Sequence, residues 1–110
     1  MNLYLDTSTS TTVLKLDQHT YTWEAGRELA EGLHQFIYQK LQLHQKDWPD
    51  LTSITFMSGP GSFTGLRIGA AIVNTLADQL QIPLYDHHGH RYPLIVPDYG
   101  RPVNITPPRK

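Results

Sequence analysis

Residues 58–69 read SGPGSFTGLRIG, and this stretch decides the fold of the chain. The short apolar run before it, residues 51–57, is typical of a buried strand. After it, apolar side chains recur at three- and four-residue spacing from Leu66 to Leu80, which predicts an amphipathic helix. Because glycine and proline interrupt regular structure, a loop is predicted between the two. Strand, loop and helix in this order are typical of the parallel crossover of an α/β protein.

The segment before this unit is predicted to form three antiparallel strands. Residues 2–6 are a short, mainly apolar run, and the small polar residues 7–12 favour a turn after it. Two further β-rich runs, residues 13–16 and 20–23, flank a hairpin turn at residues 17–18. The chain is therefore expected to start as an antiparallel meander.

A long amphipathic helix is predicted from about Gly26. Pro49 lies beyond its end, because proline cannot continue the hydrogen-bond ladder of a helix. Residues 82–85 can supply one more strand, so we predict an α/β fold with a mixed five-stranded sheet and about two main helices. This domain is expected to span residues 1–86, and the proline-rich residues 87–110 are expected to form an extended tail.

Composition limits the classes of function. The 110 residues suit one domain. Nine basic and ten acidic residues give a formal net charge of −1, so strong direct binding to a nucleic-acid backbone is not expected. The absence of cysteine excludes disulfides and thiolate zinc sites. No membrane-length apolar run and no export signal are recognisable, so we expect a cytoplasmic protein that makes no contact with membranes.

The glycine-rich stretch supports two interpretations. In the first, its backbone amides and the start of the following helix bind an anion. In the second, the glycines only let the helix approach the sheet, and Ser62 or Thr64 caps the helix. The stretch lacks the Gly-Lys-Ser/Thr ending of a P-loop, so a Walker-type NTPase is not predicted.

Residues 58–69 also resemble the signature of the TsaB family almost letter for letter. Residues 3–9, LYLDTST, are similar to the opening strand and turn of that family, and residues 26–28 to the segment that leads into its first helix. In the tail, residues 97–108 are similar to the proline-rich ending of TsaB proteins. The main likeness covers residues 1–86, and the second lobe expected of this family is missing.

This resemblance implies a single lobe of the ASKHA fold, the class of actin, sugar kinases and ribonuclease H. It implies a non-catalytic subunit that binds and activates a TsaD-like protein in forming N6-threonylcarbamoyladenosine at position 37 of tRNAs that read codons starting with A. ATP and metal are then expected on the TsaD-like partner, with no cofactor on this chain. The resemblance further implies a TsaE-like ATPase in the larger complex, only indirect contact with tRNA, and a homodimer when the chain is alone.

The resemblance places the partner on the two helices. Their apolar residues spread more widely than one core-facing stripe requires, and Ile68 and Ile72 point away from the predicted core face of the second helix. The predicted interface consists of Leu33, Phe36, Ile37, Leu41, Arg67, Ile68, Gly69 and Ile72.

The alternative, from a different functional class, is a small nucleotide- or phosphate-binding enzyme. Its candidate ligands are Asp6, which the ASKHA resemblance places near Mg²⁺-bound phosphates, with Gly61, Ser62 and Thr64. Such an enzyme needs a second lobe to enclose the nucleotide, and an aspartate in this position is also typical of an Asx turn. We assign no catalytic residue and no metal ligand, because His88 and His90 lack a third ligand and no histidine is placed beside Ser62.

Overall fold

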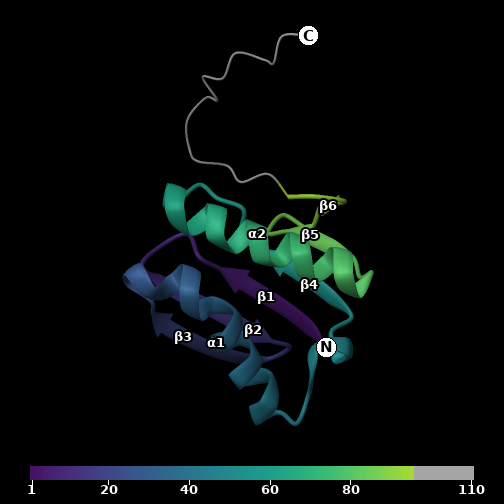
Figure 1. Ribbon diagram of the computed structural model, residues 1–110. Coiled ribbons are helices and arrows are strands. Elements are labelled where there is room, and N and C mark those ends of the chain that lie inside the picture. The colour runs from purple at the N-terminus through teal and green to yellow at the C-terminus, as the bar shows by residue number, and fades with distance from the viewer. Residues whose placement is uncertain (96–110) are drawn as a thin grey trace, which may run out of the picture.

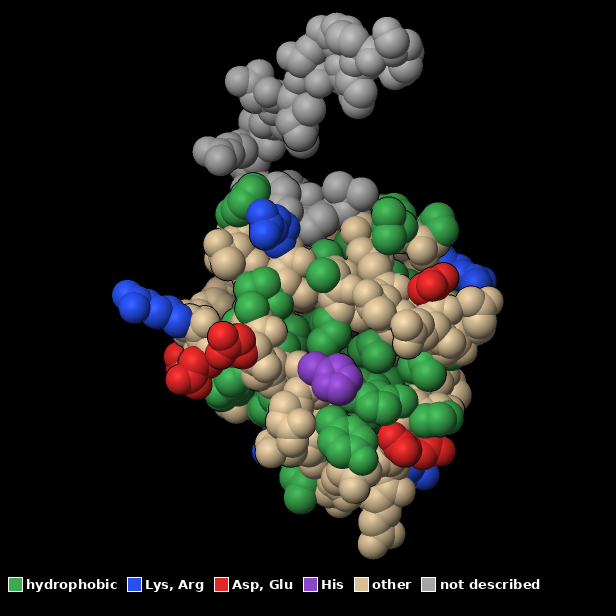
Figure 2. Space-filling view, viewed as in Figure 1, with side chains coloured by type: hydrophobic (Ala, Val, Ile, Leu, Met, Phe, Trp, Pro, Cys, Tyr) green, Lys and Arg blue, Asp and Glu red, His purple; other side chains and the backbone are tan. Residues whose placement is uncertain are grey.

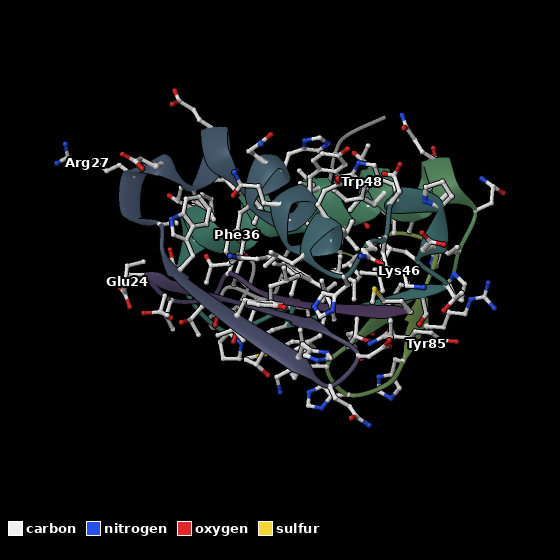
Figure 3. The ribbon with its side chains drawn as sticks, turned by 90° about the horizontal axis from the view of Figure 1, so that it is seen from below. Glu24, Arg27, Phe36, Lys46, Trp48 and Tyr85 are labelled. Atoms are coloured by element: carbon white, nitrogen blue, oxygen red, sulfur yellow. The ribbon has the colours of Figure 1, made fainter. Side chains whose placement is uncertain are left out.

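Six strands form one mixed sheet in the computed structural model, which describes residues 1–95 (Figure 1). The strands lie in the order β3-β2-β1-β4-β5-β6. Their bounds are β1 Asn2–Asp6, β2 Thr11–Leu16, β3 His19–Glu24, β4 Ser53–Phe56, β5 Leu84–Asp86 and β6 Arg91–Tyr92. Helix α1 (Leu29–Leu43) lies between β3 and β4 in the chain, and α2 (Phe63–Leu80) lies between β4 and β5. Both helices cover the same face of the sheet (Figures 1 and 3).

The central strand β1 pairs antiparallel with β2 and parallel with β4. Antiparallel neighbours need only a short turn, whereas parallel neighbours need a long crossover connection. Helices α1 and α2 supply these crossovers, because β4 pairs parallel with both β1 and β5. The predicted fold class, antiparallel start and parallel crossover are therefore confirmed.

The core lies between the two helices and one face of the sheet. In β1, Leu3 and Leu5 are completely buried, whereas the alternating residues Asn2, Tyr4 and Asp6 are partly exposed. This alternation arises because successive side chains of a strand point to opposite faces of the sheet. The fully buried hydrophobic residues of the strands are Leu3, Leu5, Leu14, Leu16, Ile54, Phe56 and Leu84.

The opposite face of the sheet carries no helix within residues 1–95. One row of side chains crosses it from Lys15 through Tyr4 and Thr55 to Tyr85, as the strand register requires. The Lys15 ammonium lies 5.2 Å from the centre of the Tyr4 ring. Burial, and secondarily the charge of Asp6, raises the pKa of Tyr4. Polar and amphipathic side chains are typical of a sheet face that remains in contact with water.

Local sequence signals define the helix ends. Helix α1 ends at Leu43, and Gln45 then adopts a left-handed conformation with φ of 58°. Pro49, the predicted stop, instead lies in a short 3₁₀ turn, Trp48–Asp50. Helix α2 starts after Ser62, whose hydroxyl accepts a hydrogen bond from the Gly65 N–H at 3.2 Å. In the described part of the chain, neither helix combines the length and the apolar character of a membrane span.

The sheet has six strands rather than the predicted five. The additional strand, β6, folds back antiparallel on β5, with Arg91 opposite Tyr85. A two-residue strand has no periodicity for a sequence pattern to reveal. The proposed boundary between a domain of residues 1–86 and a tail of residues 87–110 stays a prediction. Residues 96–110, which include the tail resemblance, lie outside the described residues.

Candidate functional site

The glycine loop, residues 58–62, is attached to the loop that follows β1. The Ser62 N–H donates to the Ser8 carbonyl at 2.7 Å. Three residues further on, the Gly65 carbonyl accepts a hydrogen bond of 2.7 Å from the hydroxyl of Thr7, which is completely buried. These hydrogen bonds hold the start of α2 against the end of β1.

Three glycines of this region lie where any side chain would collide with the loop after β1. A Cβ atom on Gly65 would lie 2.1 Å from the Thr7 carbonyl oxygen. One on Gly61 would lie 2.5 Å from the Ser8 Cβ, and one on Gly69 would lie 2.2 Å from the Thr7 hydroxyl. The glycines therefore permit close packing of α2 on the sheet. These contacts agree with the interpretation of the glycine-rich stretch as a turn that lets the helix approach the sheet, and anion binding by this stretch stays a prediction.

Asp6 closes the turn at the end of β1. Its Oδ1 atom accepts hydrogen bonds from the Ser8 N–H at 2.8 Å and from the Ser8 hydroxyl at 2.5 Å. These contacts confirm the Asx turn that was predicted for this aspartate. One carboxylate oxygen is therefore already engaged within the loop, and a role of Asp6 beside phosphates stays a prediction.

Ser62 and Thr64 line an open groove of about 510 Å³ between the beginnings of α1 and α2. Its other walls come from the loop after β1, from Thr12 of β2, from residues 25–27, 29 and 30, and from Gly65 and Ile68 of α2. Asp6 and Gly61 are not among the residues that line it. The structure thus brings together two of the four predicted ligands and leaves the other two outside the groove.

All four predicted partner-interface residues of α1 lie in the core. Leu33, Phe36, Ile37 and Leu41 are each at most 9% exposed, and all four belong to the main hydrophobic cluster. The Phe36 ring, which points toward the sheet in Figure 3, also stacks on Trp23 with 5.0 Å between ring centres. Gly69 of α2 is buried as well. These five residues are not available at the surface of this structure, because the chain's own strands and helices already cover them.

The remaining predicted interface residues are accessible. Arg67 is exposed, and its guanidinium lies 5.8 Å from the centre of the Phe63 ring. Ile68 and Ile72 are half-buried. Two more half-buried residues, Leu76 and Leu80, continue the four-residue spacing and complete one apolar stripe along α2. This spacing is visible in the sequence, so it could have identified the whole stripe.

Aromatic residues lie beside α1, in the layer that the two helices form. The Trp48 ring stacks on His34 with 5.0 Å between ring centres and on Tyr38 with 5.9 Å. Figure 2 shows hydrophobic side chains gathered over the two helices around a histidine. Sequence reasoning missed Trp48, because the 3₁₀ turn after α1 places it. We define the outer helix surface as the half-buried residues Tyr38, Trp48, Ile68, Ile72, Leu76 and Leu80.

One of the histidines after β5, His87, contacts the glycine loop. His87 Nδ1 lies 3.3 Å from both the backbone nitrogen and the hydroxyl of Ser58, so it joins the β5–β6 turn to the glycine loop. The rings of His87 and His88 are 4.0 Å apart. Within residues 1–95, no three His, Asp or Glu side chains are grouped closely enough to hold a metal ion.

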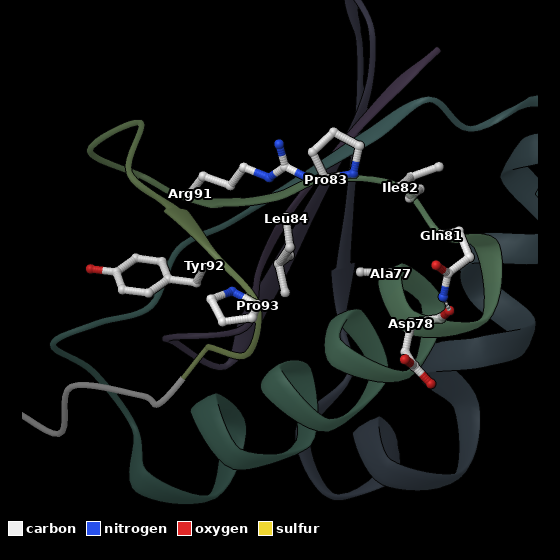
Figure 4. Close-up of a pocket in the computed structure, with 9 residues that line it drawn as sticks. All are labelled: Ala77, Asp78, Gln81, Ile82, Pro83, Leu84, Arg91, Tyr92 and Pro93. Atoms are coloured by element: carbon white, nitrogen blue, oxygen red, sulfur yellow. Dashed lines mark hydrogen bonds between the residues drawn. The ribbon is translucent and has the colours of Figure 1, made fainter.

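A second hollow, of about 480 Å³, lies between the end of α2 and strands β5 and β6 (Figure 4). Leu84 and Pro93 line it from the strand side. On its helix side, the Gln81 amide donates to the Asp78 backbone carbonyl at 2.6 Å. None of the predicted site residues lines this hollow.

Asp86 holds the β5–β6 turn in place. Its Oδ1 atom accepts hydrogen bonds of 2.9 Å from the N–H groups of both His88 and His90, and its Oδ2 atom lies 3.6 Å from the His90 ring. Burial alone would raise the pKa of Asp86. The two N–H donors, the His90 ring and the Tyr92 hydroxyl outweigh burial and hold this pKa below its usual value.

Replacing Asp86 with asparagine is therefore expected to lower the free energy of unfolding by about 1–3 kcal/mol at neutral pH, because a charged acceptor is lost. A carboxylate with a depressed folded-state pKa contributes stability above its unfolded pKa of about 3.9, and this contribution is lost as the pH falls through the folded pKa. Urea unfolding curves should show that the difference in free energy of unfolding between wild type and variant becomes smaller below about pH 4. A difference that stays constant into stronger acid would contradict this role.

Comparisons with known proteins agree with this geometry. The family model for TsaD, the tRNA N6-adenosine threonylcarbamoyltransferase, matches residues 22–90. The tRNA threonylcarbamoyladenosine biosynthesis protein TsaB of Bacillus subtilis is 51% identical over 35 residues, which are 32% of this chain and 15% of that protein. The structure of YeaZ from Pseudomonas aeruginosa superposes with a TM-score of 0.68 at 30% identity, covering 77% of this chain and 42% of that one. A second P. aeruginosa structure, of an uncharacterized protein similar to the peptidase YeaZ, gives the same TM-score and identity and covers 41% of that chain.

The sheet order, with both crossover helices on one face, defines a single lobe of the ASKHA class. The TsaD family model covers more than half of the chain, and the structural likeness is to YeaZ. The chain therefore belongs to the family that this model describes, and it is similar to the TsaB and YeaZ proteins. It spans less than half the length of the YeaZ structures that it matches.

Proposed function

We propose that this chain is an accessory, non-catalytic subunit in the formation of N6-threonylcarbamoyladenosine in tRNA, and that it acts by docking on a TsaD-like protein. The names of its relatives, a TsaB biosynthesis protein and the threonylcarbamoyltransferase TsaD, support this role. The observation that carries the proposal is the outer helix surface, which is apolar and only half covered by the chain itself.

The physical character of this surface suits a protein partner. Isolated apolar residues are common on protein surfaces, but a continuous apolar patch is typical of an interaction site. Its stripe along α2 has the spacing that a partner helix can pack against. Tyrosine and tryptophan, here Tyr38 and Trp48, are enriched in protein interfaces. Covering such a surface contributes roughly 25 cal/mol for each Å² of apolar area removed from water.

Partner and cofactor assignments follow from this docking. ATP and metal belong on the TsaD-like partner, because in this chain the glycine loop is packed against the loop after β1 and Asp6 is engaged in an Asx turn. A formal net charge of −1 supports only indirect contact with tRNA. A TsaE-like ATPase joins the larger complex, and the same helix surface supports a homodimer when no partner is present. We also propose that the protein acts in the cytoplasm.

Replacing Ile72 with glutamate is expected to weaken the complex with a TsaD-like protein at least about 100-fold, because docking would bury an unpaired charge. The chain's own stability should change by less than about 1 kcal/mol, because Ile72 is only half-buried. Multi-angle light scattering of the mixed proteins and calorimetry measure the mass and the affinity. Thr22→Glu is the matched control, because it adds the same charge on exposed Thr22 of β3. The docking proposal would be refuted if the Ile72→Glu variant bound the TsaD-like protein as tightly as wild type. It would also be refuted if the wild-type chain and the TsaD-like protein stayed unbound monomers when mixed.

Calorimetry also distinguishes this role from a nucleotide-binding enzyme. We expect the isolated chain to give no saturable heat with ATP and Mg²⁺. Micromolar binding that Asp6→Ala abolishes would support the enzyme instead.

A further inference from the structure

One buried hydroxyl lacks a partner. Thr12, at the start of β2, is completely buried, and within residues 1–95 its Oγ1 atom is the only buried side-chain nitrogen or oxygen without a hydrogen bond. The other fully buried threonine, Thr7, donates its hydroxyl hydrogen to the Gly65 carbonyl. Burying an unpaired hydroxyl is unfavourable, and most buried polar side chains have a partner. Thr12 therefore points to a bound group.

Thr12 lines the groove between the beginnings of the two helices. Helix α1, of 15 residues, and the 3₁₀ turn Gly26–Glu28 before it have no side-chain cap at their N-terminal ends. In helix α2, of 18 residues, the Ser62 hydroxyl caps the N-terminus by accepting a hydrogen bond from the Gly65 N–H. First-turn N–H groups of a helix lack an acceptor within the helix and carry partial positive charge. At α1 the preceding turn already engages the Leu29 N–H through the Gly26 carbonyl, so the groove is bordered by the start of this turn, the start of α2 and the Thr12 hydroxyl.

The other walls define the class of ligand. No aspartate or glutamate is among the residues that line the groove, although Glu28 and Glu31 lie nearby at the start of α1. Arg27 is the only charged residue of the lining, and its side chain points away from the molecule in Figure 3. Leu29, Ala30 and Ile68 make much of the remaining wall apolar. A singly charged group on an apolar stem suits this lining better than a phosphate, because the higher charge of a phosphate would meet no basic side chain directed into the groove.

We propose that this groove binds the carboxylate of a glutamate side chain that the partner protein presents. Glutamate suits the groove better than aspartate, because its apolar stem is longer. Ile68 belongs both to the groove and to the outer helix surface, so a partner that packs along α2 reaches the groove with one end. The carboxylate oxygens accept hydrogen bonds from the Thr12 hydroxyl and from the amides at the helix starts. The carboxylate site stands on the groove alone, whereas its use by a TsaD-like partner rests on the proposed function.

The first test uses the full chain without a partner. Sodium acetate, titrated against sodium chloride at constant ionic strength, should produce saturable shifts in the backbone amide NMR signals of Gly26 and Thr64. Thr12→Val, which is nearly isosteric and lacks the hydroxyl, should weaken this binding about tenfold. Inorganic phosphate should produce weaker shifts at the same sites. The absence of saturable acetate shifts, or binding of phosphate alone, would overturn the site.

The second test uses a TsaD-like partner. Thr12→Val should raise the Kd of the complex about tenfold, which corresponds to about 1.4 kcal/mol, while the free chain stays as stable as wild type or becomes more stable because no native hydrogen bond is lost. Thr22→Val, on exposed Thr22, is the matched control and should change neither quantity. An unchanged Kd for Thr12→Val would overturn use of the site by the partner. If wild type binds acetate but no TsaD-like protein, the proposed function fails and the carboxylate site stands.

Discussion

Replacing Gly65 with alanine is expected to lower the free energy of unfolding by about 3 kcal/mol or more. The new Cβ would lie 2.1 Å from the Thr7 carbonyl oxygen, which is backbone and cannot rotate away. The buried hydrogen bond from the Thr7 hydroxyl to the Gly65 carbonyl would be displaced by any movement that relieves the collision. Domains of this size have a total stability of about 5–15 kcal/mol, so a large unfolded fraction is expected. Urea unfolding followed by circular dichroism measures the change.

Gly32→Ala is the matched control for this prediction. Gly32 lies inside α1, and a Cβ there would lie 2.7 Å from the outer edge of the Trp23 ring. A half-buried side chain such as Trp23 can shift, and alanine favours a helix by about 1 kcal/mol over glycine. The control should therefore change the stability by less than about 1 kcal/mol in either direction. Equal losses for the two variants would show that close packing against Thr7 is not what requires Gly65.

Replacing Leu33 with alanine should lower the free energy of unfolding by about 2–5 kcal/mol, because it leaves a cavity among core residues. Leu33 is 1% exposed, although its sequence position suggested a partner interface. Chemical denaturation with the same optical signal tests this expectation.

Leu43→Ala is the control for Leu33→Ala, because Leu43 belongs to the same helix and is 65% exposed. It should change the stability by less than about 0.5 kcal/mol. If Leu33→Ala kept its stability but no longer bound a TsaD-like protein, Leu33 would be an interface residue and the present account of the core would be wrong.

Most of the fold could be predicted because its signals are local. Residues 2–6 and 13–16 have the composition of strands, and the apolar spacing along residues 29–41 and 66–80 is helical. Ser62 has the residue type and position of an N-cap, and it is one. Strand β6 could not be predicted, because it forms only through its pairing with β5.

The candidate sites depend on contacts that a sequence does not display. The glycine loop has the composition of an anion-binding loop, yet Ser62 and Gly65 are hydrogen-bonded to the loop after β1. The widely spread apolar residues of α1 suggested a partner surface, but the sheet covers Leu33 and Ile37. Trp48 joins the outer helix surface through the turn that follows α1.

By itself, the sequence determined the α/β class, the order of the elements and the family, because periodicity, turn residues and the motif at residues 58–69 are properties of short stretches. Only the tertiary structure decided which apolar residues form the core and which form the outer helix surface. It also placed the unpaired hydroxyl of Thr12 beside two helix N-termini. The physical reason is that burial and hydrogen-bond satisfaction depend on neighbours far apart in the chain, such as Thr7 and Gly65.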